Sequence, residues 1–273
     1  MHKHIDDVDF TIFDTETTGL EPQSGDRIVE IAAVRLRGEE KIAEFSSLVN
    51  PHRQISEAAF KVNRITPLML ESAPDIETVM PKFLSFIQDS CLCSYNASFD
   101  LEFLNNELKL MGRKNLEKVA VVDLLTMARR LMPGLERYSL GFVSERLGIK
   151  FMQEHRALSD VQLTLKLFAK LKDILKAKGI VDFMNFTSLF GINAHSLDDI
   201  LKQKISQIQQ AITLGVRLKI KYLSNANAEV TERQVLPKEI RQDKGRSYLI
   251  GYCLLRNDER AFRIDSILHL EIV

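Results

Sequence analysis

The sequence predicts an α/β protein that ends in a small all-β domain. Three observations favour this class. Residues 8–49 contain short runs with the spacing of strands, residues 50–175 contain helical spacings interrupted by strand-like runs, and residues 206–273 contain only short strand patterns separated by turn residues. Strands that alternate with helices are typical of a mixed sheet flanked by helices. The final segment is typical of a small β-barrel.

The first strands are predicted from alternating and apolar runs. Apolar and polar side chains alternate over residues 8–13, and this strand ends at a polar turn at 15–19. Two β-rich runs follow at 28–36 and 42–49, separated by a polar turn at 37–40. The simplest arrangement of these runs is a three-stranded antiparallel meander.

The pattern changes to helical spacing after Pro51. Ala73, Pro74 and Asp75 have the character of a helix start, and one apolar stripe continues to Ile87. The remaining predicted elements of this half are an apolar stretch at 91–95, a helix at 99–111, a strand at 119–122, and helices at 124–131, 140–147 and 157–175.

Three segments follow from these patterns. Residues 1–175 form the α/β domain, and residues 176–205 form a connector with a short helix, because glycine and asparagine interrupt its helical pattern. Residues 206–273 form the β-domain. Their strand patterns lie at 216–222 and 248–254, with a third at 262–264.

The composition is that of an ordinary soluble globular protein. Of the 273 residues, 45% are apolar and 27% are charged, and the formal net charge is zero. This composition excludes a disordered or low-complexity chain and argues against nucleic-acid binding by bulk charge. The charged N-terminus and the lack of a long apolar run predict neither a signal peptide nor a membrane helix. Three cysteines without a C-x-x-C pair disfavour disulfides and thiolate zinc, and a reducing, cytoplasmic location is expected.

Two acids stand at the end of the first predicted strand. Asp14 and Glu16 are separated by one residue, so on an extended chain both carboxylates point to the same face. The same spacing occurs at Asp75 and Glu77, where acids in the first turn of a helix simply complement its dipole. Asp14 and Glu16 instead follow an apolar strand and precede a loop suited to close approach of a ligand.

Two further acids lie near helix starts. Asp100 follows the apolar stretch at 91–95, and Asp160 lies at the start of the last long helix, five residues after His155. Each acid alone is equally typical of a helix first turn. Their combination with Asp14 and Glu16 in one α/β domain favours a single site.

Clustered carboxylates repel one another unless metal ions occupy the site. Oxygen ligands without cysteine favour Mg²⁺ or Mn²⁺. Two such ions activate a water and stabilise the leaving oxygen of a phosphodiester. His155 is suited to accept the proton of that water near neutral pH. The residues therefore predict metal-dependent phosphodiester hydrolysis.

Three segments resemble the motifs of the DEDDh family of 3′–5′ exonucleases, to which the proofreading subunit and domain of bacterial replicative DNA polymerase III belong. They read Phe-Asp-Thr-Glu-Thr-Thr-Gly-Leu at 13–20, Tyr-Asn-Ala-Ser-Phe-Asp at 95–100 and His-Arg-Ala-Leu-Ser-Asp at 155–160. The resemblance covers residues 8–175 and implies a ribonuclease-H-like fold. It implies that His155 is the general base and that two metal ions are held by Asp14, Glu16, Asp100 and Asp160.

The same resemblance implies a binding site for the 3′-terminal nucleotide in the loop after the first strand. Its implied residues are Thr17, Thr18, Gly19 and Leu20, with Asn96 and Phe99 along the path of the strand. Leu20 is equally typical of loop packing, and Phe99 of a helix core. The chain departs from the family at Tyr95, where a histidine is common, and this affects substrate detail rather than catalysis.

Four short segments of the C-terminal part resemble a WYL domain, an Sm-like or SH3-like β-barrel. They lie at 218–222, 233–237, 247–252 and 260–267, and two departures are Ser247 in place of tryptophan and Ser266 in place of arginine. The resemblance implies a pocket that binds nucleic acid or a regulatory ligand. Its implied residues are Arg233, Tyr248, Arg260 and Arg263. A barrel used for dimerisation or docking is the alternative.

The combined interpretation is a 3′–5′ exonuclease acting in DNA replication or repair. It is expected to hydrolyse single-stranded nucleic acid, with DNA favoured, and to release nucleoside 5′-monophosphates. RNA or short oligoribonucleotides are the alternative substrate, and a protein that grips 3′ ends without turnover is the alternative function. A polymerase or a second copy of the chain is a candidate partner, and a membrane is not.

Overall fold

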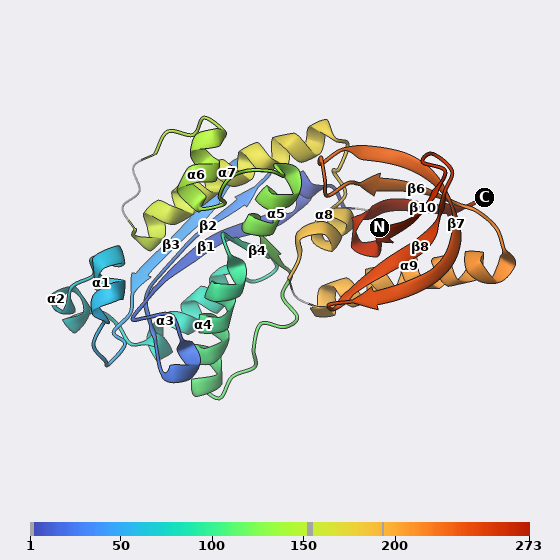
Figure 1. Cartoon of the computed structure of the whole chain (residues 1–273). Helices are drawn as coiled ribbons and strands as arrows, with labels where there is room; N and C mark the ends of the chain where they lie inside the picture. The colour runs from blue at the N-terminus through green and yellow to red at the C-terminus, as the bar shows by residue number, and fades with distance from the viewer. Residues whose placement is uncertain (1–2, 152–154, 193) are drawn as a thin grey trace.

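The computed structural model describes residues 3–151, 155–192 and 194–273. Figure 1 shows a helix-flanked sheet in the N-terminal half and a second, curved sheet in the C-terminal half, with α8 between them. None of the helices in the described ranges combines the length and apolar character that crossing a bilayer requires.

The first sheet is mixed, as predicted. Its strand order is β3-β2-β1-β4-β5, in which β1 pairs antiparallel with β2 and parallel with β4. The strands are β1 (Asp9–Thr17), β2 (Ile28–Arg37), β3 (Glu40–Leu48), β4 (Cys91–Ser94) and β5 (Val121–Asp123). The meander of the first three strands is confirmed, and β1 lies at the centre of the sheet.

Helices cover both faces of this sheet. Alternate residues of β1 enter different cores: Phe10 packs on Phe168 of α7 with ring centroids 5.1 Å apart, and Phe13 packs on Phe83 of α3 at 6.2 Å. Residues 9–13 of β1 are buried, and within the strand only Asp14 and Glu16 are partly exposed, so these two acids mark its accessible end. The helices are α1 (Glu57–Asn63), α2 (Pro67–Glu71), α3 (Ile76–Phe86), α4 (Ala97–Leu110), α5 (Leu124–Leu131), α6 (Leu140–Arg146) and α7 (Ala157–Ala177), with 3₁₀ turns η1 (Ile5–Asp7) and η2 (Pro22–Ser24).

The C-terminal sheet is antiparallel but is not the predicted closed barrel. Its order is β10-β6-β7-β8-β9, and within the described residues its edge strands β9 and β10 do not pair with each other. The strands are β6 (Leu218–Leu223), β7 (Val230–Asp243), β8 (Arg246–Cys253), β9 (Asp258–Arg263) and β10 (Ile267–Ile272), with η3 (Ile264–Ser266). Strand patterns predict the strands themselves, whereas closure depends on edge pairing.

The connector also differs from the prediction. It contains α8 (Phe183–Phe190) and α9 (Ala194–Leu214), so the predicted boundary at 205/206 falls inside one continuous helix. Ile208 and Ala211 of α9 are buried in the core of the C-terminal sheet. The helix is therefore part of the C-terminal unit, and it occupies the face that a closed barrel would have enclosed.

The two halves are joined by buried polar contacts. Arg130 of α5 donates to the carbonyl oxygen of Leu189 at 2.7 Å and to Ser266 Oγ at 2.6 Å. Lys204 Nζ of α9 donates to Ser188 Oγ of α8 at 3.3 Å. Leu223 of β6 packs in the core of the N-terminal half. The C-terminal domain is thus docked on α5 and α8.

Candidate metal centre and nucleotide pocket

Three of the predicted acids converge on one point. Asp14 and Glu16 lie at the end of β1, and Asp160 lies in the first turn of α7. One carboxylate oxygen from each lies within 4.8 Å of the others. Asp14 and Glu16 are partly exposed, whereas Asp160 is buried. The sequence prediction that distant acids share a site is met by the geometry of these three.

The electrostatics of this cluster favour a bound cation. Burial raises the pKa of Asp14 well above its usual range, and the negative charges of Asp100 and Glu16 raise it further. Burial, and then the charges of Asp160 and Glu30, raises the pKa of Glu16 to about 8. Like charges at this spacing are stabilised by a divalent cation, and carboxylate oxygens are the donors that Mg²⁺ and Mn²⁺ prefer. The residues therefore fit the predicted metal site.

Asp100 lies behind the other three acids and is buried. Its Oδ1 accepts hydrogen bonds from the Thr15 N–H at 2.9 Å and the Thr15 hydroxyl at 2.7 Å, and its Oδ2 accepts from Ser94 Oγ at 2.6 Å. Burial raises the pKa of Asp100 to about 6, although these hydrogen bonds lower it. The bonds tie the start of α4 to the ends of β1 and β4, with Asp100 next to Asp14 in charge interaction.

His155 is exposed and precedes α7 in a left-handed backbone conformation with φ of 49°. The next residue, Arg156, makes a double hydrogen bond to Glu30 of β2, from Nε at 3.0 Å and from the terminal nitrogen at 2.7 Å. Glu30 also accepts from the Ala157 N–H at 3.1 Å. One buried carboxylate thus anchors the N-terminus of the helix that carries Asp160.

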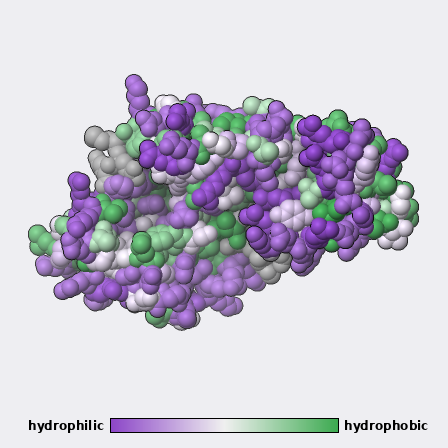
Figure 2. Space-filling view, in the orientation of Figure 1, coloured by the Kyte–Doolittle hydropathy of each residue, from purple (hydrophilic) through white to green (hydrophobic). Residues whose placement is uncertain are grey.

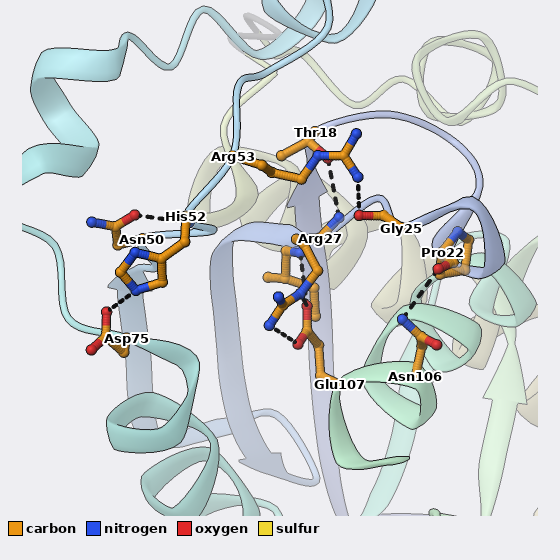
Figure 3. Close-up of polar contacts among 11 residues, drawn as sticks. Thr18, Pro22, Gly25, Arg27, Asn50, His52, Arg53, Asp75, Asn106 and Glu107 are labelled. Carbon is orange, nitrogen blue, oxygen red and sulfur yellow. Dashed lines mark hydrogen bonds and ion pairs between the residues drawn. The ribbon is translucent and has the colours of Figure 1, made fainter. Parts of the chain in front are cut away.

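A second buried ion pair anchors α4. Arg27, directly before β2, donates to Glu107 of α4 from Nε at 2.8 Å and from the terminal nitrogen at 2.7 Å (Figure 3). Arg27 and Glu30 are only three residues apart, so the start of β2 holds both helices that supply acids to the site. Sequence analysis missed this function of Glu30, although a lone acid inside the apolar run at 28–34 was a signal for it.

A cavity of about 560 Å³ opens beside the metal site. Its walls include Glu16, Thr17 and Gly19 on one side and Phe99 on another. Leu20 stands at its rim with 78% of its surface exposed. Glu16 belongs to both the acid cluster and the cavity, so a molecule in the cavity is next to the metal site.

The loop between β1 and η2 is shaped from beneath by Thr18. Thr18 is fully buried, donates its hydroxyl to Asp26 at 2.9 Å and accepts from the Arg27 N–H at 3.1 Å (Figure 3). It therefore supports the loop and does not line the cavity. A side chain at Gly19 would collide with the Asp26 carboxylate, so this close approach requires glycine. The Thr17 hydroxyl donates to the Gly19 carbonyl at 2.5 Å.

The second predicted substrate segment lies at the start of α4. Asn96 is exposed, adopts a left-handed conformation with φ of 68°, and donates its N–H to Asp123 at 3.0 Å. Phe99 packs on Phe103 with ring centroids 5.0 Å apart while it lines the cavity. Phe99 thus packs within its own helix and also faces the cavity, and its contact with a substrate stays a prediction. Tyr95 donates its hydroxyl to the Tyr138 carbonyl at 2.7 Å.

The four C-terminal residues do not form one pocket. Tyr248 and Arg263 are cross-strand partners and share one face of the sheet. Arg260 pairs with Gly251, three residues from Tyr248, and therefore lies on the opposite face. Arg233 lies on that opposite face too, with its guanidinium 4.0 Å from Cys253 Sγ. The predicted pocket is thus divided between two faces.

Comparisons with known proteins agree with this geometry. A family model described as Exonuclease (RNase_T) matches residues 11–168, and a model described as WYL domain matches residues 203–272. The first match covers more than half of the chain, and the chain belongs to the exonuclease family. More closely, it is a DEDDh-type exonuclease domain fused to a WYL domain.

The chain is similar to parts of longer replication proteins. It is 37% identical over 183 residues to the PolC-type DNA polymerase III of Thermotoga maritima, covering 67% of this chain and 13% of that protein. It is 40% identical over 183 residues to a DNA polymerase III subunit epsilon-like protein of Rhodobacter capsulatus, and the match covers 66% of this chain and 26% of that protein. The chain therefore spans between 13% and 26% of the length of these relatives.

Solved structures with the same fold include two exonucleases. Exonuclease X in complex with 5′-overhanging duplex DNA is 30% identical, with a TM-score of 0.50 and coverage of 62% of this chain and 93% of that one. Apo Exonuclease I is 16% identical, with a TM-score of 0.55, and the match covers 95% of this chain and 63% of that chain. The second likeness concerns the fold alone.

Proposed function

We propose that the protein is a metal-dependent 3′–5′ exonuclease that removes nucleoside 5′-monophosphates from single-stranded DNA ends. The observation that carries this proposal is the acid cluster that opens, through Glu16, into a cavity of about 560 Å³. A terminal nucleotide in the cavity has its phosphodiester next to the acids. The cavity is bounded by the loop after β1, so the substrate enters by an end.

The residues divide the work between metal binding, proton transfer and nucleotide positioning. Asp14, Glu16 and Asp160, with Asp100 behind them, hold two Mg²⁺ or Mn²⁺ ions, which when bound supply an activated water and stabilise the leaving oxygen. His155 accepts a proton in this scheme, because its exposed imidazole precedes the helix that carries Asp160 and a ring nitrogen can act as a general base.

The terminal base is held by apolar contact. Leu20, largely exposed at the rim, wedges against the base, and Phe99 provides an aromatic surface for stacking. Thr17 and Gly19 line the wall near the sugar, and Asn96 lies along the path of the strand. Thr18 acts indirectly through the shape of the loop.

DNA is favoured over RNA because the relatives of substantial identity are named for DNA polymerase III or solved with DNA. RNA remains the alternative outcome of the test. Association with a polymerase or a second copy and action in the bacterial cytoplasm belong to the same proposal. For the C-terminal domain, docking on the N-terminal half is favoured over a four-residue ligand pocket, since Arg263 is paired with Asp265 and Ser266 with Arg130.

The test compares single-stranded DNA and RNA of one sequence, each labelled either at the 3′ or at the 5′ end. The full chain with Mg²⁺ or Mn²⁺ is expected to release labelled mononucleotide first from 3′-labelled DNA. The Glu16→Gln variant is the matched control and is expected to release none. If the wild type forms no mononucleotide with either metal but retains 3′ ends, the protein is a binder and the proposal is wrong.

A further inference from the structure

A second cavity, of about 800 Å³, lies along the outer side of α4 and the segment that follows it. Four cationic side chains line it: Lys109, Arg113, Lys114 and Lys118. We call these the groove cations. They are exposed, and within the described part of the chain none of the four has an ion-pair partner. By contrast, Arg27 and Arg156 near the metal site are both paired with carboxylates.

This groove adjoins the nucleotide cavity at two places in the chain. Ser98 lines the groove, and the next residue, Phe99, lines the nucleotide cavity. On the opposite wall, Gln23 lines the groove and the adjacent Ser24 lines the nucleotide cavity. A chain that leaves the nucleotide cavity over the start of α4 therefore enters the groove.

The groove has fixed walls. The side-chain amide of Asn106 in α4 donates to the Pro22 carbonyl at 3.3 Å, which ties η2 to the helix (Figure 3). Asn105 accepts from the Leu116 N–H at 2.9 Å, which ties the segment after α4 back to it. Figure 2 shows that the margin of the molecule below α4 is largely hydrophilic. The cations are thus presented from an ordered surface.

Resting on the exonuclease function proposed above, we infer that this groove binds the phosphodiester backbone of the substrate strand on the 5′ side of the terminal nucleotide. Unpaired cations in a row attract a regular polyanion without reading its bases. Glu102 and Glu117 also line the groove, but Glu117 accepts from Asn115 at 2.5 Å, and the cations outnumber the two acids. An acidic protein segment is the other anionic occupant, and the test below separates the two.

The length of α4 sets the reach of the groove. Lys109 lies nine residues after Asp100 in α4, and a rise of about 1.5 Å per residue places it about 14 Å further along the helix. A strand stacked as in B-DNA advances about 3.4 Å per nucleotide, so Lys109 is reached by substrates of about five nucleotides. A trinucleotide is too short to reach it.

The experiment measures kcat and KM of the full chain on a single-stranded trinucleotide and on an oligonucleotide of about twelve nucleotides. Each is assayed between about 50 and 200 mM salt. The test variant replaces all four groove cations by glutamine. The control variant replaces four exposed cations outside the groove by glutamine: Lys82, Lys170, Lys202 and Arg256.

For the long substrate, the slope of log KM against log salt is expected to be lower by up to about 2.8 in the groove variant than in the wild type. Each of the four lost phosphate contacts contributes about 0.7 to this difference. This corresponds to about 50-fold less salt sensitivity of KM over the same range. kcat and all values for the trinucleotide should stay unchanged, and the control variant should behave as wild type. In the wild type alone, the salt slope should be steeper for the long substrate.

Equal salt slopes for the two lengths in the wild type would overturn the inference, as would a groove variant with wild-type KM for the long strand. The latter result is also what an acidic protein segment as occupant predicts. If the wild type cleaves neither the trinucleotide nor the long strand, that result instead counts against the exonuclease function itself. The two failures are therefore distinguishable.

Discussion

The ion pair between Glu30 and Arg156 offers the sharpest test of how the site is held together. Glu30 is 4% exposed at its side chain and Arg156 is 37% exposed. We compare Arg156→Met, which leaves the carboxylate, with Glu30→Gln, which leaves the guanidinium. The structure predicts that these two changes have unequal costs, because the two groups differ in their access to water.

Arg156→Met leaves the buried Glu30 carboxylate, among the residues that the structure describes, with the Ala157 N–H at 3.1 Å as its remaining donor. Removing one partner of a buried pair costs about 3–5 kcal/mol in the free energy of unfolding. After Glu30→Gln, the guanidinium turns to water, and the loss is that of hydrogen bonds to a charged group, about 1.5–3 kcal/mol. Because α7 carries Asp160, kcat should fall in both variants; a displacement of about 1 Å costs about 100-fold.

The assay is urea unfolding of each variant together with exonuclease kinetics at saturating metal. Arg35→Met is the matched control, since Arg35 pairs with Asp9 at 2.7 Å elsewhere on the same sheet. Asp9 keeps Arg37 as a partner, so this control should lose stability without losing kcat. If Glu30→Gln destabilises more than Arg156→Met, or if neither lowers kcat, the anchoring role assigned to Glu30 is wrong.

Three further predictions concern separate parts of the molecule. Asp14→Asn should abolish hydrolysis while a binding assay still detects retention of 3′ ends, and wild-type turnover would refute the metal assignment. Gly19→Ala should cost about 1–3 kcal/mol in unfolding free energy and raise KM, because the methyl displaces the Asp26 carboxylate. Burial lowers the pKa of Lys204 from 10.5 to about 8, so its buried charge opposes folding below pH 8 and this penalty is relieved as pH rises toward 10.5. The free energy of unfolding of the wild type, relative to that of Lys204→Met, should therefore rise by up to about 3 kcal/mol between about pH 8 and pH 10.5. A difference in thermal unfolding between the two proteins that does not change with pH would contradict this prediction.

The sequence predicted the catalytic half well because its signals are local. Asp14 and Glu16 interrupt an apolar strand, and Asp160 opens a strongly periodic helix, so each acid could be assigned to the end of an element. The end of a strand and the start of a helix in an α/β domain meet at one edge of the sheet. The convergence of these three residues needed no knowledge of their contacts.

The supporting contacts could not be predicted in the same way. Glu30 and Arg156 are 126 residues apart, and Arg27 and Glu107 are 80 apart, so their pairing is a product of packing rather than of any spacing. The same limit explains the C-terminal domain. Alternation identified its strands, but whether β9 and β10 pair at the edges is a long-range contact that alternation does not encode. The predicted boundary at residue 205 likewise falls inside α9.

The distribution of ion pairs explains how a chain of zero net charge can serve a polyanionic substrate. Next to the metal site, Arg27 and Arg156 are neutralised by the buried carboxylates of Glu107 and Glu30. The charge of Arg156 lowers the pKa of Glu16 by less than the charge of Glu30 raises it, so the Arg156–Glu30 pair leaves the repulsion within the acid cluster available to stabilise bound metal. Along α4 the groove cations lack such partners within the described residues, so their attraction for phosphates is not cancelled locally. The way in which charged side chains are paired, rather than their overall count, gives the metal site a negative potential and the groove a positive one.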